Sequence, residues 1–402
     1  MVCHSDPPSG GEESGFGPEL TIHRLPFAVD ALYFKSFSIH DFLALSVYCL
    51  PFTVDALKIF SLSCRIFGQG HKMKRGQAHA MNIDFIKGHM GGNTIILLDG
   101  RQIPDESAVL ETALKVLDKL HLCADQAGFI YPSESENSLR ALVVDITNRD
   151  FIPACGGFTQ VLGRALVDTD LASRFGITLT EPLTKVTLEL ASGKSSIAIH
   201  IRKGSFVKVV SDMTSFARML LEDGVAEVDL DGIRAFKSGY YLVQGADELL
   251  KNYPGADFEE MNQSAVKAVS EAQALFRQKK HSGTLHLSLF DTSPKAGGDL
   301  RAVFPHGIAT GNIEPTCGTG STALALALLV TGEGEKLGLA RGEKLTVKLE
   351  TGGDPVIGGP DITTVEVYMR DGEVSEAAFS HSFTEITAQG KISVWTGENS
   401  EL

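Results

Sequence analysis

The chain has 402 residues, of which 43% are hydrophobic and 21% are charged, and its formal net charge at pH 7 is −14. This length accommodates two ordinary domains, and the negative charge disfavours nucleic acid as a partner because its phosphates would be repelled. The six cysteines are too sparse for a disulfide scaffold, and no apolar run reaches the roughly 18 residues of a transmembrane helix. We therefore expect a cytoplasmic protein that binds neither nucleic acid nor a membrane.

The first 80 residues differ from the rest of the chain. The octapeptide LPFAVDAL at residues 25–32 recurs as LPFTVDAL at residues 50–57, between flanks that show no clear helix or strand period. Two copies are too few for a solenoid, and the acidic first residues disfavour a signal peptide. We predict that residues 1–80 are a non-native or disordered extension and that Met81 is the natural start. A peptide from residues 1–70 in the native protein would contradict this hypothesis.

From Met81 onward, strand and helix patterns alternate. A strand, a turn at Gly91 and Gly92, and a second strand come first. The remaining elements of this half are, in chain order, a helix over 107–120, a strand over 139–146, a helix that follows Cys155, and a hairpin of strands 185–190 and 196–201 that turns near Gly193.

The second half of the chain repeats this pattern. Its predicted elements are strands at 225–232, 240–244 and 284–290, a helix over 257–280, a helix that follows Cys317, and strands at 345–350, 363–369 and 391–395. A cysteine-glycine turn thus opens an apolar helix once in each half. This duplication predicts two similar α+β domains that face each other.

The helix after Cys317 has no polar face over residues 323–330, so we expect it to be buried on all sides. Its N-terminus would then be its accessible end, and the partial positive charge there lowers the pKa of a thiol. Cys155 and Cys317 are therefore candidate reactive thiols, and the glycines after them let backbone amides approach a carboxylate. We expect Cys123 to be buried and structural, His89 to be structural, and Glu314 to be solvated.

Three motifs resemble the diaminopimelate epimerase and proline racemase superfamily. FIKGHMGGN at residues 85–93 is similar to the family's opening F-x-K-x-H-x-x-G-N. ACGG at residues 154–157 stands where the first cysteine motif, C-G-N-G, would be, and CGTGSTALA at residues 317–325 is similar to the second, C-G-T-G. The resemblance covers about residues 81–400 in the same order.

The resemblance implies an α+β fold of two pseudo-symmetric domains, each a β-barrel-like mixed sheet around a central apolar helix. The expected limits are 81–212, with 385–402 returning to this domain, and 213–384. It also implies a cofactor-independent isomerase without a metal, acting on a small-molecule carboxylate, with a homodimer as a candidate assembly. Cys155 and Cys317 would be the acid-base pair, one thiolate removing a proton beside a carboxylate while the other thiol delivers one. The implied substrate-binding residues are Asn93, Gly156, Gly157, Gly318, Thr319 and Gly320.

The sequence departs from the family where the substrate would be held. Gly157 replaces an asparagine and Gln160 an arginine, Ile308 and Ala309 stand in place of an E-R-G motif, and KSGYYLV at residues 237–243 lacks the asparagine and histidine of G-N-P-H. We therefore expect a small carboxylic or amino acid other than diaminopimelate. A double-bond isomerase of an aconitate-type acid and a non-catalytic ligand-binding relative stay open as alternatives. GTGSTA at residues 318–323 fits a dinucleotide fingerprint, but no hydrophobic strand directly precedes it, which disfavours a nucleotide.

Overall fold

The computed structural model describes residues 79–103, 105–118, 120–258, 262–279, 286–307, 312–352 and 361–396. The predicted extension over residues 1–80 lies outside the described residues, apart from His79 and Ala80 at the start of the first strand.

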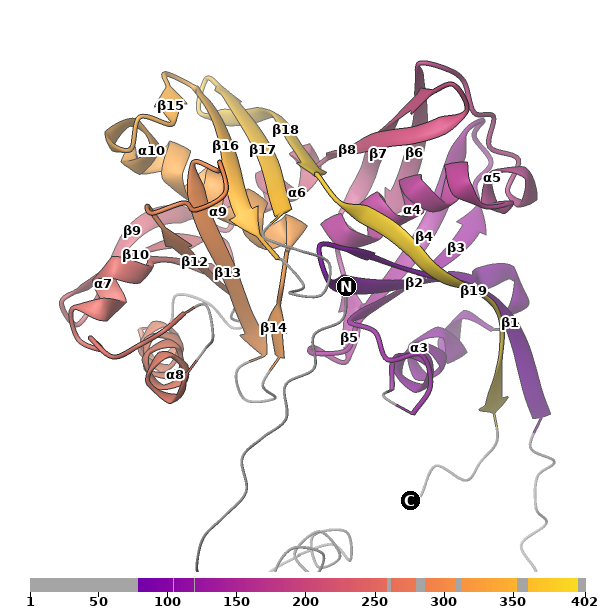
Figure 1. The fold of residues 1–402 in the computed structure, drawn as a ribbon, viewed down its shortest axis with the longest axis horizontal. Helices are drawn as coiled ribbons and strands as arrows, with labels where there is room; N and C mark the ends of the chain where they lie inside the picture. Colours follow the sequence, from indigo (N-terminus) through magenta and orange to yellow (C-terminus); the bar gives the residue numbers. More distant parts are fainter. Residues whose placement is uncertain are drawn as a thin grey trace, which may run out of the picture. The chain divides into compact units, whose positions relative to one another are not determined.

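The first lobe is a curved mixed sheet (Figure 1). Its strands lie side by side in the order β19 (Thr384–Thr396), β1 (His79–Met90), β2 (Asn93–Asp99), β3 (Gln126–Pro132), β4 (Ser138–Asp145), β6 (Leu183–Leu190), β7 (Gly193–Arg202) and β8 (Ser205–Asp212). The pairs β2–β3 and β4–β6 are parallel, and the other neighbouring pairs are antiparallel. The predicted turns are confirmed: Gly91 and Gly92 have positive φ between β1 and β2, and Gly193 begins β7.

The second lobe repeats this pairing pattern. Its strands follow the order β9 (Val225–Leu230), β10 (Ile233–Ser238), β11 (Tyr241–Gly245), β12 (His286–Asp291), β13 (Leu300–Gly307), β16 (Lys344–Thr351), β17 (Asp361–Arg370) and β18 (Glu373–His381). Here β11–β12 and β13–β16 are the parallel pairs. Strands β8 and β18 hold equivalent last places, and they pair antiparallel at Ser211 with Phe379, which joins the two lobes into one sheet. The predicted pseudo-symmetric α+β fold is confirmed.

The remaining elements are short strands and helices. The short strands are β5 (Asp150–Ile152), β14 (Asn312–Glu314) and β15 (Ala340–Arg341). The helices are η1 (Gly100–Gln102), η2 (Glu106–Ala108), α3 (Val109–Leu117), α4 (Gly156–Asp168), α5 (Leu171–Arg174), α6 (Thr214–Glu222), α7 (Ala246–Leu250), α8 (Gln263–Gln278), α9 (Gly318–Val330) and α10 (Glu333–Lys336). Helix α8 starts later than predicted because the Asn262 side chain accepts a hydrogen bond from the Ala265 amide and caps the helix.

Each lobe has an inner core around one helix and an outer core under another. Helix α4 is the centre of the first inner core and α9 of the second. All residues of α9 from Gly318 to Leu329 are buried, so the predicted burial on all sides is confirmed, and exposure begins at Val330. Helix α3 covers the outer core of the first lobe, and α7 and α8 cover that of the second. The two central helices are therefore fixed by packing along most of their length.

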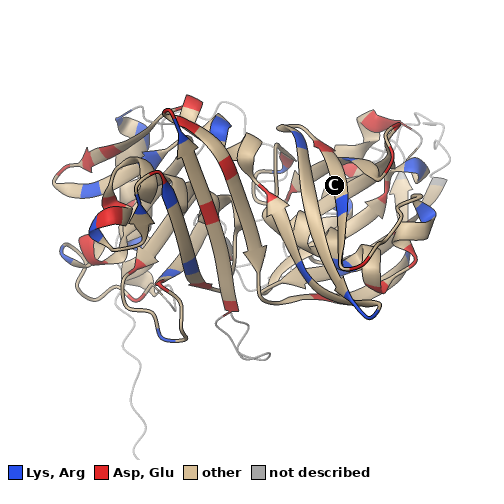
Figure 2. Cartoon of the chain, turned by 90° about the horizontal axis from the view of Figure 1, so that it is seen from above, with Lys and Arg blue, Asp and Glu red and all other residues tan. Residues whose placement is uncertain are grey.

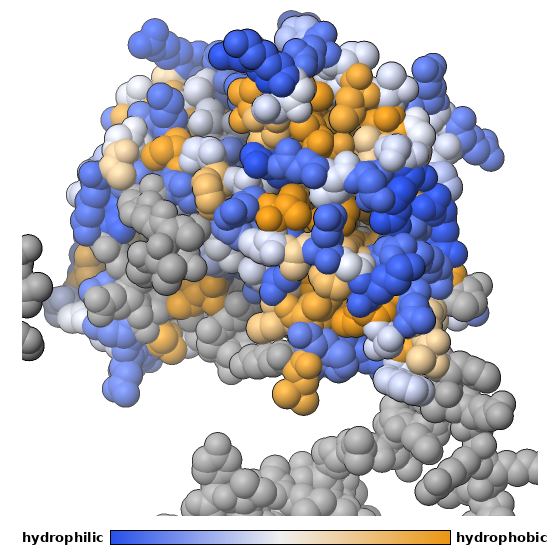
Figure 3. All heavy atoms as spheres, turned by 45° about the vertical axis from the view of Figure 1, so that its right-hand side comes forward, coloured by the Kyte–Doolittle hydropathy of each residue, from blue (hydrophilic) through white to orange (hydrophobic). Residues whose placement is uncertain are grey.

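The described surface carries both positive and negative charges. Lys and Arg residues are interspersed with Asp and Glu in Figure 2. On the face in Figure 3, hydrophilic residues dominate and hydrophobic residues form separate small patches between them. Among the described helices, none combines the length and the apolar character that crossing a bilayer requires.

The N-termini of α4 and α9 meet where the lobes join. A Cβ atom placed on Gly156 would lie 2.6 Å from the Cα atom of Gly318, and the reverse substitution gives the same distance. The ring of Phe379 lies 3.3 Å or less from either position. Only glycine fits at both helix starts, because any side chain would contact the opposite backbone.

We expect Gly156→Ala and Gly318→Ala each to lower the free energy of unfolding by about 1–3 kcal/mol, since the added methyl group pushes two backbones apart. Urea denaturation measures this. Gly255→Ala is the matched control, because nothing lies within 4 Å of its added Cβ. Equal stability of all three variants would contradict the close contact.

Candidate functional site

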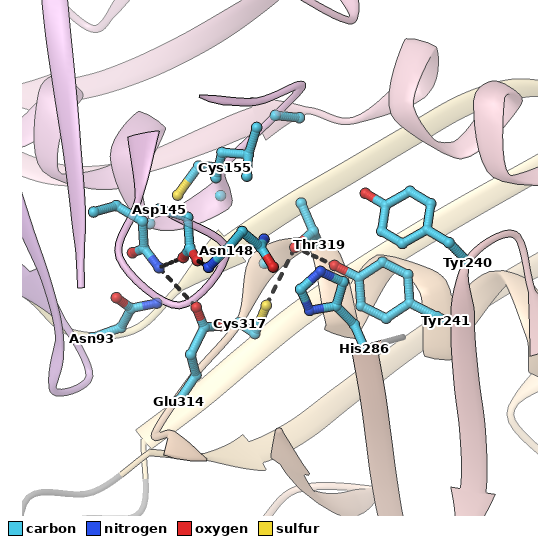
Figure 4. Close-up of a pocket in the computed structure, with 16 residues that line it drawn as sticks. Asn93, Asp145, Asn148, Cys155, Tyr240, Tyr241, His286, Glu314, Cys317 and Thr319 are labelled. Carbon is cyan, nitrogen blue, oxygen red and sulfur yellow. Dashed lines mark hydrogen bonds between the residues drawn. The ribbon is translucent and has the colours of Figure 1, made fainter. Parts of the chain in front are cut away.

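A small pocket lies at the meeting point of the two helices (Figure 4). Its cavity volume is about 40 Å³, which accommodates a few water molecules at roughly 10–15 Å³ each. Both lobes line it through Asn93, Gln126, Asp145, Asn148, Ile152, Ala154, Cys155, Gly156, Gly157, Tyr240, Tyr241, His286, Glu314, Cys317, Gly318 and Thr319. Among the described residues, no group of His, Cys, Asp and Glu is arranged to hold a metal ion.

Cys155 and Cys317 occupy equivalent places in this pocket. Each is the N-cap of its helix, with extended backbone and a buried side chain that is 7% exposed in Cys155 and 5% exposed in Cys317. The sulfur of Cys155 accepts a hydrogen bond of 3.3 Å from the Phe158 amide, and the sulfur of Cys317 accepts one of 3.3 Å from the Gly320 amide. The two candidate thiols therefore lie at two helix N-termini that share one cavity.

Burial opposes the effect that the sequence predicts for these thiols. It raises the pKa of Cys155 far above the usual thiol value, and the amide of Phe158 offsets only part of this effect. Burial likewise raises the pKa of Cys317, and the nearby Glu314 carboxyl raises it further, while Thr319 and the Gly320 amide lower it. The lowering of the thiol pKa values that the helix N-termini were expected to cause is thus outweighed by burial, and both thiols are protonated at neutral pH.

Glu314 is buried rather than solvated, which corrects the sequence prediction. It ends β14 and is only 6% exposed. Its Oε1 accepts a 2.8 Å hydrogen bond from the amide of Gln126, and the same amide donates to Asp145 at 2.8 Å. Burial, followed by the charge of Asp145, raises the pKa of Glu314 to about 8, and Glu314 is hydrogen-bonded to the Cys317 thiol. The spacing E-x-x-C was the available signal, because it places Glu314 at the end of a strand three residues before Cys317.

Asn93 joins the lobes and faces the pocket. Its amide donates a 2.9 Å hydrogen bond to the Thr316 carbonyl. Its Oδ1 atom is buried and has no hydrogen-bond partner among the described residues, so it is available to a donor on a ligand. Four other residues predicted for substrate binding also line the pocket, namely Gly156, Gly157, Gly318 and Thr319. Gly320 does not line it; its amide is used by Cys317.

An aromatic wall on the second lobe was not predicted. Tyr241 stacks on His286 at 5.3 Å between ring centroids and lies 4.9 Å from Tyr240. The hydroxyl of Tyr241 donates a 2.8 Å hydrogen bond to Thr319, whose oxygen lies 3.2 Å from the sulfur of Cys317. Burial lowers the pKa of His286 to about 4, so its ring is neutral at pH 7. The only signal in the sequence was that residues 237–243 lack the asparagine and histidine of the G-N-P-H motif.

Three further residues lie away from the pocket. Gln160 is buried and bonds Ser211 at 2.8 Å and the amide of His381 at 3.4 Å, so it ties α4 to the strand pair that joins the lobes. His89 accepts a 3.3 Å hydrogen bond from the Gly92 amide, in line with the structural role predicted for it. Cys123 is exposed, and its predicted burial is wrong because it follows the end of α3 in a left-handed turn with φ of 48°.

Comparison with protein-family models and with curated proteins gives no match. Solved structures do match. A hydroxyproline epimerase from Agrobacterium vitis aligns with a TM-score of 0.54 and 14% identity over 80% of this chain and 94% of that one. A probable proline racemase from Agrobacterium radiobacter K84 aligns with a TM-score of 0.52 and 15% identity over 77% of this chain and 92% of that one. A methylitaconate-delta-isomerase aligns with a TM-score of 0.51 and 13% identity over 78% of this chain and 96% of that one.

At these identities the likeness establishes the fold. The chain has the fold of these three solved structures, as the resemblance of its sequence motifs predicted. The names of the three similar structures describe a racemase, an epimerase and an isomerase.

We expect Glu314→Gln to stabilise the protein increasingly as pH rises from 5 to 8. A carboxyl whose pKa rises from 4.5 to about 8 on folding favours the folded state below pH 4.5, and this contribution is lost as pH rises through 8. The difference in unfolding free energy should therefore grow by up to about 1.4 kcal/mol per pH unit in this range. Urea denaturation at several pH values tests this, and a pH-independent difference would contradict the buried, protonated carboxyl.

Proposed function

We propose that this protein is a cofactor-independent isomerase of the racemase or epimerase type that acts on a small carboxylic or amino acid. Cys155 and Cys317 would exchange protons with one substrate carbon from opposite sides. The observation that carries the proposal is the pair of thiols, each capping a helix, at two helix N-termini that meet in one buried pocket. The likeness in fold to a racemase, an epimerase and an isomerase supports it.

The substrate carboxylate would be held by the two helix ends. The backbone amides of Gly156, Gly157, Gly318 and Thr319 lie at the first positions of α4 and α9, where amides lack partners within the helix. Each helix adds about half a positive charge at its N-terminus. Among the described residues that line the pocket there is no Lys or Arg, so backbone dipoles would carry the compensation of the anion.

Proton transfer would use both sulfurs. One thiolate removes the proton from the carbon beside the carboxylate, forming an S–H bond while the electron pair of the C–H bond moves toward the carboxylate. The amides at the helix ends stabilise this developing charge. The second thiol then gives its proton to the opposite face of the carbon and becomes the thiolate. The two cysteines together hold one proton before the reaction and one after it, and each has taken the other's role.

Formation of the first thiolate needs a proton acceptor, because burial keeps both thiols protonated. Glu314 would serve here. It is hydrogen-bonded to Cys317 and, with its pKa of about 8, loses its proton more readily than either buried thiol. Below pH 8 the carboxyl already holds a proton and accepts none, whereas above pH 8 it is able to take the proton of Cys317.

We expect a screen of amino and unsaturated carboxylic acids in deuterated water to identify an acid that exchanges a carbon-bound proton, measured by proton NMR. Cys155→Ser and Cys317→Ser should each lower its turnover by about 10²–10⁴-fold, since each removes one acid-base group. Cys123→Ser, at the exposed cysteine, is the control and should leave the rate unchanged. Full turnover in both pocket variants would rule out the two-thiol mechanism.

The rate with that acid should rise with pH through about 8, because Glu314 must be ionised to accept a proton. Glu314→Gln should remove this ascending limb and lower the plateau. A pH–rate profile of both proteins measures the effect. If the rate of the Glu314→Gln protein still rose with pH through about 8, the rise would belong to another titrating group.

A double-bond isomerase of an aconitate-type acid is the second candidate. The likeness in fold to a methylitaconate-delta-isomerase favours it, and the same two thiols would serve, one removing a proton and the other adding one at a different carbon. The screen separates the two functions because a double-bond shift moves the signals of the vinyl protons, whereas inversion at a carbon leaves every double bond of the acid in place.

A further inference from the structure

The two halves of the pocket use equivalent positions of the repeated module. Cys155 is the third residue after the end of β5, and Cys317 is the third residue after the end of β14. Ile152 and Glu314, the last residues of these strands, are therefore equivalent. Gly157 and Thr319, the second residues of α4 and α9, are equivalent as well. Asn93 and Tyr241 correspond as well, because each begins a strand directly after a two-residue hairpin turn.

The side chains at these equivalent positions differ. Near Cys155 they are Ile152, which is apolar, and Gly157, which has no side chain. Near Cys317 they are Glu314 and Thr319, which both interact with its sulfur. Asn93 donates to the carbonyl of Thr316 in the opposite lobe. The backbone of the pocket is thus close to symmetric, whereas its hydrogen-bonding groups gather around one thiol.

A chain of hydroxyl groups ends at Cys317. The Tyr241 hydroxyl donates to the oxygen of Thr319 at 2.8 Å, and that oxygen lies 3.2 Å from the sulfur (Figure 4). A threonine hydroxyl has one proton and two acceptor sites. Since Tyr241 occupies an acceptor site, the Thr319 proton is available to the sulfur, and each hydrogen bond in such a chain strengthens the next.

The aromatic packing fixes the position of the Tyr241 hydroxyl. Its ring is buried, stacks on His286 at 5.3 Å between centroids, and meets the edge of Phe216 at 6.4 Å. A ring held from both sides keeps its hydroxyl in one place, which is the property that a group needs in order to orient a neighbour.

We propose that Tyr241 is a positioning residue that directs the Thr319 hydroxyl proton to the sulfur of Cys317 and thereby makes Cys317, rather than Cys155, the thiol that carries the negative charge once Glu314 and Cys317 have lost one of their two protons. This deepens the proposed function, on which it rests, by giving the two thiols different starting roles. Glu314 and Cys317 share one proton once the pair has lost the other. A donor aimed at the sulfur favours the arrangement in which that proton lies on the carboxyl and the charge on the sulfur.

The test measures the reactivity of each thiol separately. The Cys155→Ser protein reports on Cys317 and the Cys317→Ser protein on Cys155, with alkylation by iodoacetamide followed by peptide mass spectrometry from pH 6 to pH 10. Adding Tyr241→Phe should slow alkylation of Cys317 by about 3- to 10-fold below its midpoint, which is the effect of one lost hydrogen bond between neutral groups, here between Tyr241 and Thr319, and move the midpoint to higher pH. The rate at Cys155 should not change.

Further variants separate positioning from general packing. Thr319→Val should reproduce the effect of Tyr241→Phe, and Thr319→Ser, which keeps a hydroxyl, should restore reactivity. Tyr253→Phe is the control, because the Tyr253 hydroxyl bonds Glu271 at an exposed site. An unchanged profile at Cys317, or equal slowing at both cysteines, would overturn the proposal. If neither cysteine reacts in the folded protein while both react in urea, the proposed function itself fails, because a pocket that admits no reagent, or forms no thiolate between pH 6 and pH 10, could not carry out the proton transfer.

Discussion

The N-termini of α4 and α9 touch at Gly156 and Gly318, and the rest of the site depends on this contact. It brings to one buried point two sets of backbone amides that have no carbonyl partner within their own helix, together with two partial positive charges. Like ends repel each other, so the contact persists because the helices are fixed elsewhere, by the inner cores and by the β8–β18 pair. Such a point favours an anion or a group able to become one, and both helices place a thiol there.

Among the described residues that line the pocket, negative charge on the acidic groups is limited by protonation, and no Lys or Arg side chain compensates it. Burial raises the pKa values of Asp125, Asp145 and Glu314, and it raises those of both cysteines. The amide of Gln126 bridges Asp145 and Glu314 across the lobes. Because Glu314 and both thiols are protonated at neutral pH, a bound carboxylate would meet the helix ends there without competition from a thiolate.

Local sequence patterns predict the parts of this structure that local physics decides. The absence of a polar face predicts the burial of α9, and the glycines after Cys155 and Cys317 predict helix starts with open amides. The hairpin at Gly91 and Gly92 follows from the positive φ that glycine allows. The duplication of the cysteine-glycine turn predicts two similar lobes.

The features that the sequence does not predict depend on contacts between distant segments. Glu314 is buried because Gln126, 188 residues earlier, comes alongside it from the other lobe. Tyr241 gains its role only when the start of β11 lies beside the first turn of α9, where Thr319 accepts its hydroxyl. Gln160 similarly bonds His381, 221 residues later, instead of facing the pocket. Polarity and period along the chain contain no information about these pairings.

We propose that the two helix ends form one anion site between two thiols. A crystal structure with the acid that exchanges its proton bound tests this most directly. We expect the carboxylate to lie within hydrogen-bond distance of amides of both α4 and α9, and the reacting carbon to lie between the sulfurs of Cys155 and Cys317. A carboxylate bound to one helix alone, or a carbon that approaches only one sulfur, would contradict it.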